Sequence, residues 1–243
     1  MKLEIIGFTI DSCITAQRAG ANRIELCDNY YEGGTTPSYA FIEAARKNLS
    51  IELYVMIRPR GGDFLYSADE FDIMKRNIEV CKKLGCDGVV MGLLHADGSI
   101  DKKRTAPLVE YAYPLGVTFH RAFDRTNDPF QALEDVIDMG CERILTSGLQ
   151  PKATDGAALI KQLVQQADDR IIIMPGSGVT SQNILQLAEA TGATEFHSSA
   201  SMFTADTMPY HNPHLEEEKR ILVNEQEVQA MSTLLKTFFN TPA

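Results

Sequence analysis

Short apolar runs alternate with longer amphipathic segments along the whole chain. The apolar runs are rich in Ile, Leu and Val, as in strands that are buried on both faces. They predict strands at residues 3–6, 23–27, 51–58, 88–92, 117–120, 143–146, 171–174 and 195–198. The segments between them repeat apolar positions at helical spacing. They predict helices at residues 14–19, 37–47, 67–85, 101–113, 129–140, 154–166, 181–191 and 225–239.

Residues at the segment boundaries support these predicted helices. Ser67 and Glu70 have the spacing of a capping box, and Pro129 suits the first turn of a helix. Gly20 and Gly85 follow the first and third helical segments, where glycine commonly ends a helix. The alternation of strand and helix is therefore marked by local signals as well as by hydrophobicity.

Strands that alternate with helices pair in parallel, and eight such units in 243 residues match a (β/α)₈ TIM barrel. We expect an α/β fold with one domain over residues 1–243. A doubly wound open sheet is the alternative, but no Gly-x-Gly-x-x-Gly follows the first strand. The longest excursion, about residues 199–224, lies between the eighth strand and the last helix, which places it at the barrel mouth.

Composition narrows the class of protein. Hydrophobic residues make up 44% of the chain and charged residues 23%, as in an ordinary globular domain. The net charge of −10 argues against binding to nucleic acid or to an anionic membrane surface. The sequence has no apolar run long enough to span a membrane and enters its first strand directly, so we expect a cytoplasmic protein. Its five cysteines show no Cys-x-x-Cys spacing, so neither a disulfide framework nor a structural zinc site is indicated.

Polar side chains alternate with the apolar ones inside several predicted strands. Since alternate residues of a barrel strand face the helices and the barrel axis, the polar set is expected to face the axis. This set includes Glu4, Glu25, Arg58, His120, Glu195 and His197. A barrel interior is normally aliphatic, so these residues form either an ion-pair network or a functional site. Their position toward the ends of the strands favours a polar site at the mouth.

The loops after the strands carry further candidate residues. They are Arg60 and Asp63 after the third strand, Arg121 and Asp124 after the fifth, Ser147 and Gly148 after the sixth, Gly176, Ser177 and Gly178 after the seventh, and Ser198 at the end of the eighth. Glycines and small hydroxyl residues at the last two loops are the parts from which barrels build a phosphate pocket. We therefore expect an anion site there, with Arg58 and these loop arginines as its cations.

Several long motifs resemble the CutC copper homeostasis family. They are residues 23–27, 33–38, 56–67, 118–124, 145–148 and 195–200. The resemblance implies a cytoplasmic (β/α)₈ barrel, a homo-oligomer of two or four subunits, and a role in handling copper. Members commonly carry a cysteine at the end of the first strand, where this chain has Ile6, so Cys27 is left as the one candidate thiolate for Cu(I). Copper would then bind weakly, or through His120, His197 and methionines.

Three functions remain open from the sequence. The first is a copper-binding homeostasis protein, which rests on the resemblance and on Cys27. The second is an enzyme of unassigned reaction that holds a small anionic or phosphorylated ligand, with Glu25 or Glu195 as general base and His120 or His197 as acid. The third is a scaffold with a rigid polar core. The residue pattern favours the second.

Overall fold

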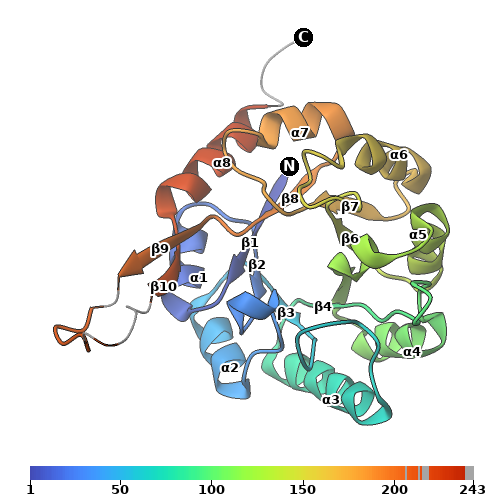
Figure 1. The fold of residues 1–243 in the computed structure, drawn as a ribbon, viewed down its shortest axis with the longest axis horizontal. Helices are drawn as coiled ribbons and strands as arrows, with labels where there is room; N and C mark the ends of the chain where they lie inside the picture. Colours follow the sequence, from blue (N-terminus) through green and yellow to red (C-terminus); the bar gives the residue numbers. More distant parts are fainter. Residues whose placement is uncertain (206, 213, 215–218, 239–243) are drawn as a thin grey trace.

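The computed structural model describes residues 1–205, 207–212, 214 and 219–238. Eight parallel strands form a barrel, which confirms the predicted fold (Figure 1). The strands are β1 Lys2–Gly7, β2 Arg23–Leu26, β3 Glu52–Met56, β4 Gly88–Met91, β5 Gly116–Phe119, β6 Arg143–Thr146, β7 Ile172–Pro175 and β8 Glu195–Ser198. They are hydrogen-bonded in the order β7-β6-β5-β4-β3-β2-β1-β8, and the two ends of this order lie next to each other and close the ring.

The helices form an outer ring around the strands (Figure 1). They are α1 Ile10–Arg18, α2 Tyr39–Asn48, α3 Ala68–Leu84, α4 Lys102–Ala112, α5 Pro129–Asp138, α6 Ala157–Ala167, α7 Ile184–Thr191 and α8 Glu225–Thr237. Two short 3₁₀ helices, η1 Tyr30–Glu32 and η2 Arg121–Arg125, follow β2 and β5. The capping box predicted at Ser67 and Glu70 is present, and Gly85 ends α3 in the left-handed conformation.

Side chains of the strands alternate between two environments. Ile5, Ile24 and Val55 are fully buried in the main hydrophobic cluster, which fills the space between strands and helices. Glu4 and Glu25, on the same strands, are equally buried but belong to the polar barrel interior. The sequence pattern therefore assigned the two faces of these strands correctly. The helix-facing layer supplies the hydrophobic stabilisation, so the interior layer is left for charged groups.

The third strand is shorter than the predicted range of residues 51–58. Its ladder with β4 ends at Met56, and the backbone N–H of Arg58 donates instead to the hydroxyl of Thr36 at 2.8 Å. Arg58 is therefore the first polar residue of the loop above the barrel.

The predicted long loop after the eighth strand contains a β-hairpin. Strands β9 Ser201–Ala205 and β10 Lys219–Val223 pair antiparallel and project from the barrel (Figure 1). The ring of Phe203 packs edge-on against Tyr30 of η1, with 6.1 Å between centroids. The last predicted helix extends to residue 239, which lies outside the described residues. Among those that are described, no helix combines the length and the hydropathy that crossing a bilayer requires.

Candidate active site

Charged side chains fill the barrel interior in two layers, and the lower layer lies at the amino-terminal ends of the strands. Arg23, Arg143 and Glu195 are the first residues of β2, β6 and β8. Glu195 Oε2 accepts hydrogen bonds from Arg23 Nη2 at 2.8 Å and from Arg143 Nε at 2.6 Å. Arg23 also bonds Glu4 at 3.2 Å and Glu52 at 3.0 Å. These charges pair with one another, so the lower layer is a buried ion-pair network.

Glu195 was expected at the barrel mouth as a candidate general base, and the structure places it at the opposite end of its strand. Glu195 and His197 both face the interior, but two residues of a strand separate them by roughly 6–7 Å along the barrel axis. Only His197 reaches the upper layer. Glu195 neutralises two buried arginines and does not line the cavity described below.

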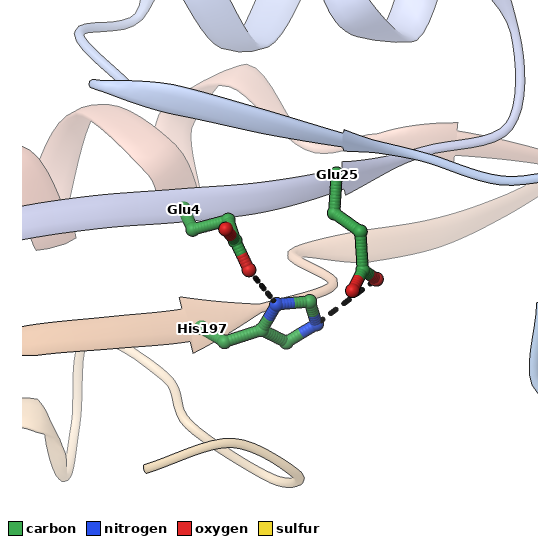
Figure 2. A group of neighbouring side chains, drawn as sticks. All are labelled: Glu4, Glu25 and His197. Atoms are coloured by element: carbon green, nitrogen blue, oxygen red, sulfur yellow. Dashed lines mark hydrogen bonds and ion pairs between the residues drawn. The ribbon is translucent and has the colours of Figure 1, made fainter. Parts of the chain in front are cut away.

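The upper layer is centred on His197, which lies between two carboxyl groups (Figure 2). His197 Nδ1 is 2.7 Å from Glu4 Oε1, and Nε2 is 4.0 Å from Glu25 Oε2. The three residues come from neighbouring strands, because β1 pairs with both β2 and β8 and places Glu4 opposite His197. They also form the one group of described residues whose spacing could hold a metal ion.

The carboxyl groups on the two sides of His197 differ in pKa. Burial raises the pKa of Glu4, but the hydrogen bond and charge of His197, with the charge of Arg23, outweigh it and hold that pKa below its usual value. Burial raises the pKa of Glu25 to about 7, against the opposing charge of His197. Burial lowers the pKa of His197, yet both carboxylates outweigh it and raise the pKa. Since ionised Glu4 can only accept, His197 donates from Nδ1 and turns Nε2 toward Glu25.

His120 lies across the interior from this group and is neutral. Burial and the charge of Arg58 lower the pKa of His120 to about 3. Its Nδ1 accepts a hydrogen bond from the backbone N–H of Ala122 at 3.2 Å, so the ring carries its hydrogen on Nε2. His120 Nε2 is buried and has no hydrogen-bond partner. The ring of Phe64 packs against the imidazole at 4.8 Å between centroids.

Arg58 is buried above the barrel and anchors the surrounding loops. Its guanidinium donates to the carbonyl oxygens of Glu32 at 2.6 Å, Gly34 at 2.8 Å and Gly62 at 2.9 Å. Arg58 also acts to lower the pKa of Tyr66 through its charge, although burial outweighs this effect and raises that pKa to about 12. The Nη atoms of Arg58 are therefore already occupied, so the residue contributes a fixed positive charge and few free hydrogen-bond donors.

A cavity of about 290 Å³, here called the inner cavity, opens above this layer. Its polar wall includes Glu25, Arg58, His120, Arg121 and His197, and its apolar wall includes Ile6, Phe8, Met56, Phe64 and Leu145. A larger outer cavity of about 860 Å³ adjoins it, because the two share Gly33, Arg58, Phe64 and Arg121 as lining residues. The inner cavity is near the lower size limit of small-molecule sites.

Buried polar atoms without a partner are concentrated at the inner cavity. Five such side-chain atoms occur among the described residues, on Glu25, Arg58, Tyr66, Thr105 and His120. Arg58 donates through its other nitrogens to three carbonyl oxygens, Tyr66 lines neither cavity, and Thr105 lies on α4 outside the barrel. The remaining two are Glu25 Oε1 and His120 Nε2, whose side chains both line the inner cavity. An unsatisfied buried polar group is costly, so this pair is suited to a ligand.

The arginines predicted in the loops are already paired. Arg60 Nε bonds Glu70 at 2.6 Å, and its Nη2 bonds Asp63 at 3.0 Å. Arg60 does not line either cavity, whereas Asp63 borders the outer one. The sequence could not show that Glu70, which also caps α3, would reach back to Arg60.

Asp124 connects the loops that follow β5 and β6 through hydrogen bonds. It accepts hydrogen bonds from Arg121 Nε at 2.8 Å, from the Thr146 hydroxyl at 2.6 Å and from the backbone N–H of Ser147 at 3.0 Å. Gly148 donates its N–H to the Thr146 hydroxyl. Of these predicted ligand-binding residues, only Arg121 lines the inner cavity, while Asp124 borders the outer one.

The predicted phosphate loop is partly at the cavity. Ser177 and Gly178 line it, whereas Gly176 donates its N–H to Thr146 and packs against Leu145 and His197, where a Cβ would clash. The Ser198 hydroxyl donates to the carbonyl of Val179, away from any ligand. The backbone N–H groups of Ser177 and Gly178 have no partner among the described residues and remain available to an anion.

Cys27 is fully buried beneath the cavity and does not line it. Its thiol donates to Glu25 Oε2 at 3.6 Å, and burial together with the charge of Glu25 raises the pKa of Cys27 well above its usual value. Its buried neighbours are Tyr54, Met56 and Val90, with Ile6 packed against them. The thiol is therefore protonated, and the hydrophobic cluster to which it belongs has Ile6 packed against it and no second cysteine among its members.

Two contributors to the site were not predicted in these roles. Glu4 was expected in the interior, but its hold on His197 depends on the register between β1 and β8. Phe64 was not considered. Its place directly after Asp63, in a loop rich in glycine and arginine, was the available signal.

Comparison with known proteins identifies relatives of this chain. A family model described as the CutC family matches residues 1–202. A CutC family protein of Chromobacterium violaceum is 56% identical over 208 residues, which cover 86% of this chain and 84% of the relative. The copper homeostasis protein cutC homolog of Homo sapiens is 47% identical over 210 residues, which cover 86% and 77%. A crystal structure of CutC from Streptococcus agalactiae has a TM-score of 0.79 at 34% identity and covers 82% of this chain and 98% of that one.

These matches confirm the resemblance read from the sequence motifs, and the chain belongs to the CutC family.

Proposed function

We propose that this chain is an acid–base enzyme that acts on a small anionic ligand in the inner cavity. The observation that carries the proposal is the pair of buried, unpartnered atoms Glu25 Oε1 and His120 Nε2 in one cavity. One is a carboxyl oxygen with a pKa of about 7, and the other belongs to a neutral imidazole. Pairs of titratable groups whose environments separate their pKa values are typical of acid–base sites.

The proton-transfer group in this proposal is Glu25 together with His197. Glu4 fixes the orientation of the His197 ring through Nδ1, so Nε2 is directed toward Glu25. A carboxyl group with a pKa of about 7 exists in both protonation states near neutral pH, which suits a general base. His120 serves as a fixed donor, because its Nε2 hydrogen is not lost or gained near neutral pH.

Local positive charge favours an anionic ligand in spite of the chain's net charge of −10. Arg58 and Arg121 line both cavities, and Arg58 is held in place by three carbonyl oxygens. Ser177 and Gly178, whose backbone N–H groups have no partner among the described residues, line another part of the same cavity. A ligand with one anionic end could therefore meet these groups while its other end reaches Glu25.

Ligand-induced stabilisation tests this proposal. We expect at least one of phosphate, sulfate, pyruvate or a small sugar phosphate to raise the midpoint temperature of thermal unfolding of the wild type. At about 100 times Kd the stabilisation should be about 2.7 kcal/mol. His120→Phe keeps the ring but removes Nε2, so it should lose most of the shift, whereas His214→Phe, at an exposed position, should keep it. If no anion stabilises the wild type, the proposed function is wrong.

Copper binding is the second candidate, since the human relative is named a copper homeostasis protein. The donors in this chain do not fit a tight Cu(I) site. Cys27 is one buried, protonated thiol, and Ile6 faces it from β1. The group of Glu4, Glu25 and His197 offers oxygen and nitrogen, which suit harder metals than Cu(I), and Glu4 is already paired with Arg23.

A competition titration with a Cu(I) chelator tests the copper role. If copper is bound through Cys27, the wild type should bind it weakly. Cys27→Ala should lower the copper affinity by a further factor of about ten or more, because loss of a residue that merely supports a metal ligand already lowers affinity by that factor. Cys141→Ala is the matched control, because it removes another buried thiol, which lies just before β6. It should bind copper as the wild type does. Equally poor binding by wild type and Cys27→Ala would remove copper as a function of this site.

The cytoplasmic location and the homo-oligomeric state expected from the sequence stay predictions. The five cysteines are all free thiols, which suits a reducing compartment.

A further inference from the structure

We propose that the inner cavity binds a small carbonyl compound with a C–H bond next to the carbonyl group, and that it removes this proton to form an enolate. This inference rests on the proposed acid–base function and names its substrate class. Three features carry it: the unpartnered donor of His120, the unpartnered oxygen of Glu25, and the absence of lysine among the lining residues that the structure describes.

The donor is suited to a carbonyl oxygen. His120 carries its hydrogen on Nε2, because Ala122 N–H occupies Nδ1; Nε2 is buried without a partner, and the side chain lines the cavity. Negative charge develops on the carbonyl oxygen when the neighbouring carbon loses its proton, and a fixed donor stabilises that charge without reorganisation. Arg58 lies near enough to lower the pKa of His120 by its charge, so the same oxygen would lie in a positive field.

The base is suited to a carbon acid. Glu25 Oε2 is engaged by the Cys27 thiol and lies 4.0 Å from His197, whereas Oε1 has no partner. Oε1 is therefore the oxygen whose hydrogen-bonding capacity is unused, on a side chain that lines the cavity.

A Schiff base, a Ser177 nucleophile and a Cys27 nucleophile are not supported by the residues around the cavity. No lysine is present among its described lining residues, so a Schiff base has no partner there. The Ser177 hydroxyl donates to the carbonyl of Pro151, and the Cys27 thiol is protonated and buried outside the lining. Proton transfer is the chemistry that the remaining groups can perform.

The step balances without another reactant. Glu25 Oε1 takes the proton from the carbon next to the carbonyl group, and the electron pair of that C–H bond forms the C=C bond of the enolate. The carbonyl π electrons move to the oxygen, which accepts the hydrogen bond from His120 Nε2. Return of the proton to carbon restores the substrate or gives an isomer. In D₂O, deuterium reaches Glu25 from solvent by way of His197 and replaces the hydrogen.

Proton NMR in D₂O tests the inference with two anionic probes: pyruvate and dihydroxyacetone phosphate. Saturation transfer reports binding of each probe, and loss of the C–H signal next to the carbonyl group reports exchange. We expect at least one probe to bind and to exchange about 100-fold or more faster than in buffer. Glu25→Gln should lower the exchange rate by about 10²–10⁴ while binding is kept. Glu189→Gln, an exposed glutamate on α7, should leave the rate unchanged.

His120→Phe provides a second variant in case Glu25→Gln does not fold, and we expect it to lower exchange by about 10²–10³. A probe that binds without exchange in the wild type would overturn this inference and leave the proposed acid–base function standing. If neither these probes nor the anions named above bind, both are overturned. Exchange that persists at the wild-type rate in a folded Glu25→Gln protein would also overturn the inference, because the base would then be another group.

Discussion

Glu195→Gln should lower the free energy of unfolding by about 3–5 kcal/mol, the usual loss when one partner of a buried ion pair is removed. Glu195 Oε2 accepts from both Arg23 and Arg143, which are themselves almost completely buried. The amide keeps the size of the side chain but removes its negative charge. Two guanidinium groups would then share the lower layer with Glu4 as their remaining fully buried carboxylate.

Urea unfolding followed by circular dichroism measures this loss, provided the slope of the transition is unchanged. Glu225→Gln is the matched control, since Glu225 also bonds an arginine, Arg18, but at an exposed position. Water screens that surface pair, so its removal should change stability little. Similar losses in the two variants would contradict the assignment of Glu195 to a buried structural network.

Glu25→Gln should stabilise the protein above neutral pH. The pKa of Glu25 is raised from 4.5 to about 7 in the folded state, so the folded state holds this proton more tightly than the unfolded chain. Below pH 4.5 both states are protonated and the carboxyl group costs nothing. As pH rises to 7 the unfolded state gains from ionisation first, and stability falls. Above pH 7 the full cost is about 3 kcal/mol for a shift of this size.

The glutamine cannot ionise, so the difference in unfolding free energy between variant and wild type should grow from about pH 4.5 and level off above pH 7. His197 has a raised pKa too, and the stability that its charged form supplies is lost as pH rises through that pKa. Both groups therefore make the wild type less stable with rising pH. Urea unfolding at a series of pH values measures the difference. Glu189→Gln should follow the wild-type curve, and a pH-independent difference for Glu25→Gln would disprove the buried titration.

A stabilising substitution at the proposed base is informative about function. Proteins keep a destabilising buried carboxyl group where activity requires it, so stability and activity should change in opposite directions in Glu25→Gln. Glu195→Gln should lower stability without removing a group that touches the ligand. The two glutamates therefore separate the structural layer from the reactive one.

The barrel could be predicted because its signals are local. Strand faces alternate between residues such as Ile24 and Glu25, and caps such as Ser67 mark helix ends. These patterns need no knowledge of distant neighbours. The same alternation correctly placed His120 and His197 inside, and it brought Glu25 into the same group.

The alternation of residues along a strand does not predict how high along the barrel axis a side chain lies. Glu195 and His197 have the same inward direction, but their partners differ: Arg143 is 52 residues from Glu195, and Glu4 is 193 residues from His197. Such pairs depend on register between strands that are distant in sequence. The prediction for the loop residues was limited by a related cause. Asp124 was predicted to bind a ligand, but it accepts a hydrogen bond from the loop after β6.

The hairpin after β8 was missed because its two strands are separated by residues with few strand signals. Phe203 of this hairpin packs against Tyr30, which is far from it in the sequence. The residues next to Phe203 and Tyr30 in the sequence give no indication of this contact.

The adjoining cavities imply that charge acts on a ligand before it reaches the reacting groups. The outer cavity is the larger of the two, and its wall carries three arginines and three carboxylates: Arg58, Arg121, Arg125, Glu32, Asp63 and Asp124. A charged ligand that arrives through it therefore meets groups of both signs before it reaches the inner cavity. Discrimination by charge would then be a property of the association rate, weakened by salt, while discrimination by reactivity is left to the inner cavity.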